Sequence, residues 1–293
     1  MRENQSMKIA TSAAAALLLA HPASAQEEQV SAGPAGDAEM ADTVYDDTWL
    51  SIGVGAGYGP SYDGSDDYVF FPAPLIQGRV GGIGIQPRPA GIALDLVSDP
   101  EDGIGFALGP VARMRFNRSR QIKDPVVEAA GELKEAIEVG GQAGISLPKV
   151  LNPYDSLSFG VDALWDVNGA HGGMTLTPSV TYFTPLSRGL AASLSFSAER
   201  GDRDYMDYYY SVSPAQAAAS GLPQFSAGSG WTKAGATVLL WIDFDGDLTN
   251  GGLAGVLVGG HSRMLGDAKD SPYTSIRGST GQWFGAVGIG YTF

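Results

Sequence analysis

The segment Asp243-Phe-Asp245-Gly-Asp247 carries carboxylates at alternate positions, which is how a calcium-binding loop begins. An EF-hand loop also needs Gly at its sixth position and Glu at its twelfth, where this chain has Leu248 and Ala254. Because these two positions do not match, we interpret the segment as a tight hairpin turn, for which Asp and Gly are favoured.

His261 and Ser262, with Asp267 close by in the sequence, have the residue types of a hydrolase triad. The surrounding alternation predicts a strand, in which successive side chains point to opposite faces, so His261 and Ser262 cannot meet. Of the other histidines, His21 lies in an N-terminal segment that we expect to be removed, and His171 lies in a Gly-rich turn. The chain has no cysteine, which excludes disulfides, thiolate catalysis and cysteine-bound zinc. We expect no catalytic, cofactor-binding or metal-binding residue.

Four tyrosines, Tyr205, Tyr208, Tyr209 and Tyr210, are clustered in the long segment 200–230. Clustered tyrosines can form a recognition surface, because each offers rigid contact area and a hydroxyl group. They can equally belong to the aromatic girdle at a membrane interface. The sequence leaves both interpretations open.

The carboxy-terminal residues must close the fold, and their side chains alternate in size and polarity with a period of two. One face of this strand carries large apolar and aromatic residues, and the other carries mostly small or polar ones. This pattern, ending on an aromatic residue, is typical of the closing strand of an outer-membrane β-barrel. In that class the terminal aromatic residues, here Tyr291 and Phe293, belong to the signal that the barrel-assembly machinery reads. The first face consists of Trp283, Gly285, Val287, Ile289, Tyr291 and Phe293, and the second of Phe284, Ala286, Gly288, Gly290 and Thr292.

The amino-terminal residues predict export. A basic start at Lys8, an apolar stretch from Ala10 to Ala20 and the cleavage pattern Ala23-Ser-Ala25 form a signal peptide over residues 1–25, with either Met1 or Met7 as the start. The acidic segment 26–47 is poorly patterned and is expected to be a flexible periplasmic leader. The barrel then covers residues 48–293, and no later stretch is long and apolar enough for a transmembrane helix.

The overall composition agrees with a barrel. The mean hydropathy is −0.02, with 41 Gly and 17 Pro, because each lipid-facing apolar residue is followed by a small or polar one. The net charge of −14 argues against nucleic acid as a partner.

Short and long connections alternate along the chain, as the periplasmic turns and external loops of such barrels do. We predict an all-β, transmembrane antiparallel up-and-down barrel of about 12 strands, or 10 if segment 82–97 is one strand or the first pair is irregular. Both termini are then periplasmic. The expected strands are 48–58, 68–79, two within 82–97 joined at Pro87 to Ala90, 104–117, 137–147, 156–167, 173–183, 190–199, 231–244, 252–265 and 281–293. The long external connections are 118–136, 200–230 and 266–280.

The alternation also predicts which side chains face the lumen. In 137–147 the residues Glu138, Gln142 and Ser146 point inward, and in 156–167 the outward set includes Phe159 and Trp165. The inward-facing residues carry both positive and negative charges, and the barrel has a modest diameter. This favours a lumen plugged by ion pairs over a selective conduction path. The charged residues expected in the lumen are Arg113, Arg115, Glu138, Asp162, Asp166, Glu199, Lys233, Asp243, His261 and Arg263.

Several ordered motifs make the chain resemble the MltA-interacting protein family, also called MipA/OmpV, along nearly all of its mature length. The resemblance implies an outer-membrane barrel, associated in some members with murein metabolism by bridging a lytic transglycosylase to a murein synthase. Other members are linked to osmotic or drug response and to adhesion, and no catalytic residues are known for the family. The motifs are Gly59-Pro-Ser-Tyr-Asp-Gly-Ser65, Pro72-Ala-Pro74, Tyr208-Tyr-Tyr-Ser-Val-Ser213, Ser220-Gly-Leu-Pro223, Gly228-Ser-Gly-Trp231 and Leu265-Gly-Asp-Ala-Lys-Asp-Ser-Pro272.

Two functions of different classes remain at this point. The leading hypothesis is a non-enzymatic scaffold that links murein-processing enzymes at the outer membrane, and the alternative is a small-solute channel or transporter, or a stress-response or adhesion protein. The expected partners are outer-membrane lipid, the barrel-assembly machinery and murein-processing enzymes. No cofactor is expected.

Overall fold

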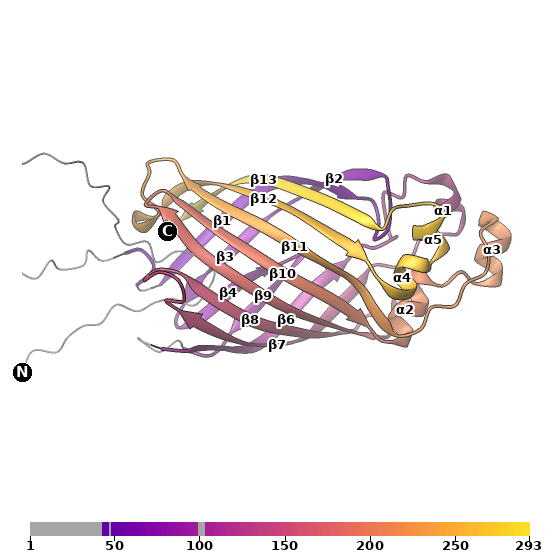
Figure 1. The fold of residues 1–293 in the computed structure, drawn as a ribbon, viewed down its shortest axis with the longest axis horizontal. Helices are drawn as coiled ribbons and strands as arrows, with labels where there is room; N and C mark the ends of the chain where they lie inside the picture. The colour runs from indigo at the N-terminus through magenta and orange to yellow at the C-terminus, as the bar shows by residue number, and fades with distance from the viewer. Residues whose placement is uncertain (1–42, 47, 99–102) are drawn as a thin grey trace, which may run out of the picture.

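A computed structural model of the chain describes residues 43–46, 48–98 and 103–293. The predicted signal peptide and most of the predicted leader lie outside these residues. The strands form one antiparallel sheet that closes on itself, because β13 pairs with β1 from Ser51↔Thr292 to Tyr58↔Gly285 (Figure 1). The strands are β1 (Trp49–Pro60), β2 (Tyr68–Pro72), β3 (Leu75–Val80), β4 (Ile83–Arg88), β5 (Gly91–Asp95), β6 (Gly105–Arg115), β7 (Ala136–Pro148), β8 (Ser156–Asp166), β9 (Met174–Ser187), β10 (Leu190–Gly201), β11 (Gly230–Asp243), β12 (Gly252–Met264) and β13 (Gly281–Thr292).

The thirteen segments form a closed ring of 12 strands plus one extra strand, β2. Both β2 and β3 pair with β1, and their registers are continuous across Ala73 and Pro74, where Pro74 lacks the N–H that a ladder needs. The predicted 12-strand barrel is confirmed, and the alternative of 10 is wrong. The prediction of two strands in 82–97 with a turn at 87–90 also matches β4 and β5.

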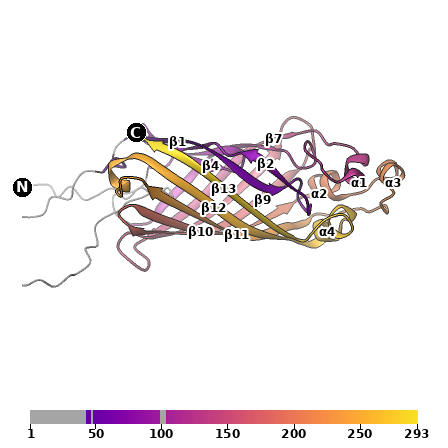
Figure 2. The same ribbon diagram turned by 90° about the horizontal axis from the view of Figure 1, so that it is seen from above.

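The two ends of the barrel differ. At the turn end, where the carboxy terminus lies, short turns join the strands (Figure 2). Gly81 and Gly82 lie there with φ of 58° and 84°, a conformation that glycine adopts without strain. The predicted hairpin turn after Asp243 is also found there, since one carboxylate oxygen of Asp243 accepts the N–H groups of Asp245, Gly246 and Asp247.

At the opposite, helical end, the three long connections fold into short helices that the sequence interpretation did not include. Asp124 and Asp202 begin α1 and α2 by accepting backbone N–H groups, and Ser213 forms a capping box with Gln216. None of the helices in the described residues has the length and apolar character needed to cross a membrane. The helices are α1 (Pro125–Ala129), α2 (Arg203–Tyr210), α3 (Pro214–Ser220), α4 (Gly266–Asp270), α5 (Pro272–Ser275) and the 3-10 turn η1 (Leu248–Asn250).

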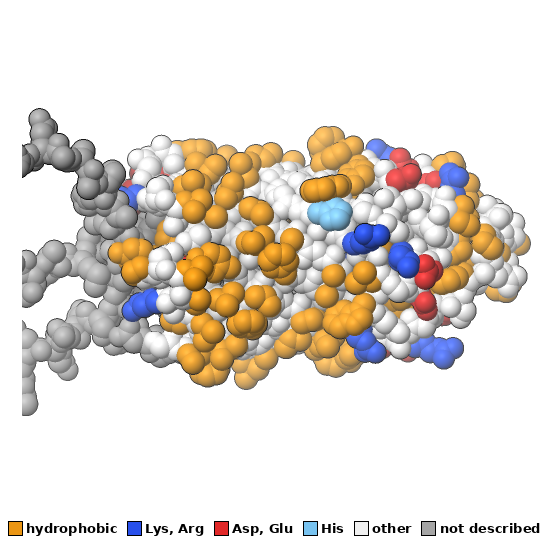
Figure 3. Space-filling view, in the orientation of Figure 1, with side chains coloured by type: hydrophobic (Ala, Val, Ile, Leu, Met, Phe, Trp, Pro, Cys, Tyr) orange, Lys and Arg blue, Asp and Glu red, His pale blue; other side chains and the backbone are white. Residues whose placement is uncertain are grey.

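The faces of most strands follow the prediction. In β7, Glu138 and Gln142 are buried and Ile137 is exposed, and in β8 the outward Phe159 and Trp165 are exposed. Figure 3 shows apolar side chains over much of the outer wall on the face in view, with most of the charged side chains toward the helical end. This is the surface that a strand barrel presents to lipid.

The predicted inward placement of His261 and Arg263 is wrong. His261 lies opposite Trp283 in the register of β12 and β13, and directly opposed residues of an antiparallel pair share a face. The two rings are in contact, with centroids 4.5 Å apart, and Trp283 is 65% exposed on the outer wall. Arg263, two residues along the same strand, is exposed on that wall as well.

One line of the wall is incompletely paired. Within the described residues, β3 pairs with β4 only from Gly78 to Val80, beside the turn, and β2 pairs with β1 alone. The hairpin of β4 and β5 is also short, and the register of β5 with β6 runs from Gly91 to Ala93. We refer to the boundary between β3 and β4 as the seam.

Candidate functional site

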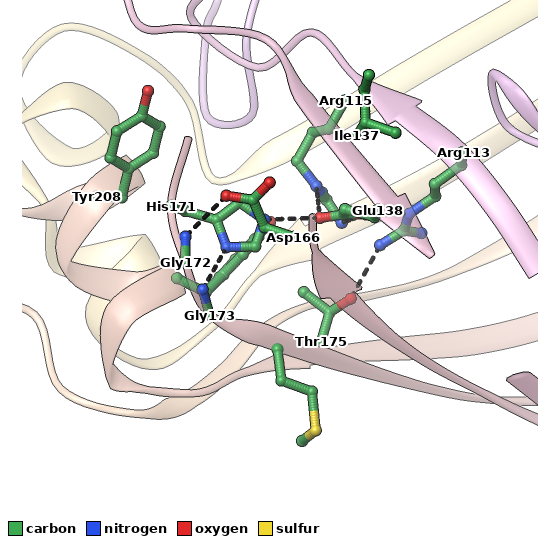
Figure 4. A network of polar contacts seen from close by, with 12 residues as sticks. Arg113, Arg115, Ile137, Glu138, Asp166, His171, Gly172, Gly173, Thr175 and Tyr208 are labelled. Carbon is green, nitrogen blue, oxygen red and sulfur yellow. Dashed lines mark hydrogen bonds and ion pairs between the residues drawn. The ribbon is translucent and has the colours of Figure 1, made fainter. Parts of the chain in front are cut away.

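A charge network lies inside the lumen, close to the helical end (Figure 4). Its centre is Glu138 on β7, whose side chain is fully buried. Arg113 lies directly opposite Glu138 in the register and forms an ion pair with it. Arg115, two residues further along β6, points to the same side, and its Nε donates to Oε1 of Glu138 at 2.8 Å.

A second carboxylate completes the network from the other side of the lumen. Glu199 on β10 accepts hydrogen bonds from Nη2 of Arg115 at 2.8 Å and from Nη2 of Arg113 at 3.3 Å. The hydroxyls of Tyr205 and Thr232 also donate to it, at 3.1 and 3.2 Å. The buried Arg115, the partly buried Arg113 and two buried carboxylates thus offset each other's charge, as a low-dielectric interior requires.

His171 also belongs to the network. Its Nδ1 accepts the backbone N–H of Gly173 at 3.0 Å, so Nε2 carries the proton that is donated to Oε1 of Glu138 at 3.1 Å. The sequence placed His171 in a Gly-rich turn, which is correct, but gave no signal that the turn folds its ring into the barrel. Asp166 holds this turn by accepting the N–H groups of Asn168 and Gly172.

Two further ion pairs join segments that are far apart in the sequence. Arg88, at the tip of the β4–β5 hairpin, donates to Asp162 at 2.7 Å and to Gln142 at 2.6 Å. Lys233 donates to Asp63 at 2.8 Å. Sequence reasoning missed Arg88 and Asp63, because both lie in predicted turns or loops, where alternation assigns no direction.

The tyrosine cluster closes the helical end from within. Tyr205, Tyr209 and Tyr210 of α2 are at most 1% exposed, and they pack with Met206 and Met264. Neither a recognition surface nor an aromatic girdle describes these three residues, because the segment folds back over the barrel mouth as a helix. Burial raises the pKa of the Tyr205 hydroxyl, which stays protonated and able to donate to Glu199.

A second layer covers α2. The guanidinium of Arg118 lies 3.6 Å from the ring centroid of Tyr273, and its Nη1 donates to the carbonyl of Tyr209. Burial lowers the pKa of Arg118. Asp124, the cap of α1, is joined to Arg277 at 2.7 Å. The segments at the helical end are therefore docked on one another and on the barrel.

The turn end is closed by apolar residues. Tyr45 and Trp49 pack edge to face at 4.9 Å, and Phe183, Trp241 and Leu248 complete a buried cluster across the lumen. A cavity of about 20 Å³ remains beside them. Burial, followed by the charge of Asp243, raises the pKa of Tyr45 to about 12.

Between the two plugs, hydroxyl groups pair across neighbouring strands. Ser146 and Ser158 are 2.9 Å apart, and Thr181 and Ser195 are 2.8 Å apart. Ten inward polar side chains are at most 7% exposed, whereas others, including Ser158, Thr181 and Ser195, are half-buried. The ten are Ser51, Gln77, Asp95, Glu138, Gln142, Ser146, Thr175, Ser193, Glu199 and Thr232.

The described residues offer no arrangement for metal binding, since they hold no group of three or more His, Cys, Asp or Glu side chains that could bind an ion. The arginines and carboxylates of the network are already bonded to one another. What this arrangement can do is hold strands together across the lumen and exclude water.

The chain was compared with protein families and with solved structures. The family model described as "MltA-interacting protein MipA" matches residues 52–293. Among solved structures, the chain is similar to the outer-membrane expressed OmpT of Vibrio cholerae, with 7% sequence identity, 84% of this chain and 97% of that chain covered, and a TM-score of 0.35. It is also similar to OccK11 (OpdR) of Pseudomonas aeruginosa, with 11% identity, 86% and 97% covered, and a TM-score of 0.30. Likenesses this weak carry no argument about function. No curated protein matches the chain.

Proposed function

The chain belongs to the MltA-interacting protein family, and from that membership we propose that it is a non-enzymatic outer-membrane scaffold that holds murein-processing enzymes at the membrane. The family is described by its interaction with MltA, and the scaffold would link such a lytic transglycosylase to a murein synthase. The single observation that supports this proposal best is the lumen, which is closed at both ends by buried clusters.

A lumen closed at both ends favours a role carried by the surface of the barrel. Ion pairs and hydroxyl pairs between strands make the wall rigid, and a rigid wall is a good platform for partners. No argument for catalysis arises from the network, because its charged groups are bonded to one another and buried.

The orientation in the membrane belongs to the same proposal. Barrels of this kind have long external loops and short periplasmic turns. The helical end then faces the exterior, and both chain termini and the turn end face the periplasm, where murein lies. Partner enzymes would dock on the turn end, which presents Leu151 at 79% exposure and the exposed Asp245.

The test is a retention experiment. Detergent-solubilised barrel is immobilised and given a purified lytic transglycosylase and a purified murein synthase of the same bacterium. We expect both to be retained, and we expect the turn-end variants Leu151→Asp and Asp245→Lys to retain several-fold less. Ile276→Asp is the matched control, because Ile276 is 54% exposed at the helical end. Retention that is absent, or that Ile276→Asp lowers as much as the turn-end variants do, contradicts the proposal.

A further inference from the structure

Near the helical rim, the outer wall of β10 to β13 changes from apolar to basic. Arg200 on β10 and Arg263 on β12 are both exposed. Beside them lie Trp231, 42% exposed, and the stacked pair of His261 and Trp283. We define the outer basic patch as Arg200, Trp231, His261, Arg263 and Trp283.

The register places these residues on one face. Arg200 lies opposite Trp231, and His261 lies opposite Trp283. Arg263 lies opposite Ala234, which in turn lies opposite Ala198. The two arginines are thus on strands two apart, about 10 Å across the strands, and Arg200 is two residues further along, so their backbones are about 12 Å apart. The small Ala198 and Ala234 fill the wall between them without standing above it.

Neither arginine side chain of the patch is neutralised within the described part of the chain, where no side-chain hydrogen bond or ion pair joins Arg200 or Arg263 to another residue. The lumen arginines Arg113 and Arg115 each bond to two carboxylates, and the exposed Arg120 and Arg188 each bond to one. The chain carries a net charge of −14, so this local positive charge is not part of a general excess. It points to an anionic ligand from outside the chain.

The wall beneath the patch shows what else that ligand carries. On the same strands, toward the turn end, Phe196, Val238 and Leu257 are 54%, 44% and 41% exposed. Tryptophans at the boundary mark the level at which the hydrocarbon region meets the headgroups. A ligand that contacts both zones has acyl chains below and anionic oxygens above.

We propose that the outer basic patch binds the phosphates of a phosphorylated glycolipid in the outer leaflet. Guanidinium groups pair with phosphate through two parallel N–H···O bonds, which suits Arg200 and Arg263. Two arginines about 12 Å apart can each take one phosphate of a glycolipid that carries two. This inference rests on the proposed function in one respect: the lipid meets this rim only if the helical end faces the exterior. The chemistry of the patch does not depend on that orientation.

The experiment measures lipid retained by the folded, full-length barrel in detergent, with native mass spectrometry as the readout. The probes are a diglucosamine lipid with two phosphates, the same lipid without phosphates, phosphatidylglycerol and inorganic phosphate. We expect the bisphosphorylated glycolipid to bind most tightly. Arg200→Gln and Arg263→Gln should each weaken it about fivefold, and the double variant about 25-fold. Arg188→Gln, an exposed arginine at the turn end, is the control and should bind as the unchanged protein does.

Each contrary result overturns the proposal in a different way. Equal binding of the glycolipid without phosphates means that the aromatic and apolar wall alone retains lipid. If phosphatidylglycerol binds as tightly as the bisphosphorylated glycolipid, the patch has no preference for a glycolipid. If inorganic phosphate displaces the glycolipid at a similar concentration, the patch is a site for a free ion. An unchanged double variant, shown to be folded by its altered migration on boiling, means that the arginines are not used. Because no murein enzyme is present, the scaffold proposal can fail or succeed independently.

Discussion

Glu138 is the residue on which the lumen network depends. It pairs with Arg113, Arg115 and His171, and its side chain has no access to solvent. Removing one partner of a buried ion pair leaves the other charge uncompensated, which costs more than the pair itself contributes. The same reasoning applies to Glu199, but its position beside Tyr205 also links the network to the helical plug.

Replacing Glu138 with Gln should lower the free energy of unfolding by about 3 to 5 kcal/mol, because Arg113 and Arg115 lose half of their compensation. Urea unfolding of the barrel in lipid vesicles measures this effect. Asp162→Asn is the matched control and should cost less, since its partner Arg88 is 24% exposed and can turn toward water. Equal losses in the two variants would show that the network adds nothing beyond an ordinary pair.

Deleting Phe293, or replacing it with Asp, should lower the amount of folded barrel in the membrane. The backbone of Phe293 exchanges hydrogen bonds with Leu50, and its ring lies 4.7 Å from that of Tyr291. Western blots of unboiled membranes measure the folded form. Thr292→Val leaves both aromatic rings in place and serves as the control. Wild-type amounts of folded protein without Phe293 would contradict the prediction.

At the scale of elements, alternation predicted the strands well and the connections poorly. The strand bounds agree with β6 to β13 within a few residues, because one apolar face must meet lipid along each crossing. In β12 the polar His261 and Arg263 suggested a lumen face, and only the pairing with β13 shows that they point outward. Four of the five helices are at most seven residues long, too short to show an apolar period, and the period of α2, which buries Tyr205, Met206, Tyr209 and Tyr210, was missed. The helices are stabilised by docking, so Tyr205 and His171 could not be placed from the sequence.

The docking of α1 should depend on pH. Burial alone would raise the pKa of Asp124, but hydrogen bonds from Arg277 and from the N–H groups of Val127 and Val126 outweigh it and lower the pKa. A carboxylate with a lowered pKa stabilises the folded form above its unfolded value of about 4, and this contribution is lost as the pH falls through the folded value.

Acid-stable protease should therefore cleave segment 118–136 faster as the pH falls below about 4. Asp124→Asn should be cleaved faster even at neutral pH and should show less change with pH. Asp204→Asn, an exposed position on α2, is the control. A cleavage rate that does not depend on pH in the unchanged protein would contradict this account.

At the scale of the whole molecule, two plugs of different chemistry close the same lumen in series. The helical end is closed by α2 above the ion network, and the turn end by the cluster around Trp49 and Trp241. Opening either end alone leaves the other in place. A conduction path then requires two independent changes.

In planar bilayers, the purified barrel should therefore show no steady open current. Tyr205→Ala with Tyr209→Ala should stay closed, and Trp49→Ala with Trp241→Ala should stay closed as well, whereas all four changes together should raise the current. Single-channel recording of the folded variants measures this. A large, stable current from the unchanged protein would contradict the plugged lumen and favour the channel interpretation.

At the seam between β3 and β4, the wall is held by few backbone pairs. Elsewhere in the barrel, except between β5 and β6, each strand is paired along much of its length, but here the described register runs only from Gly78↔Ile85 to Val80↔Ile83. A cylinder under lateral load yields along its least-bonded line, so thickness changes in the bilayer would be absorbed there. Amide hydrogen exchange should be fastest in the β4–β5 hairpin and slowest in β10 to β12. The barrel would then respond to membrane tension as a split ring does, flexing at one line while the rest of its circumference keeps its shape.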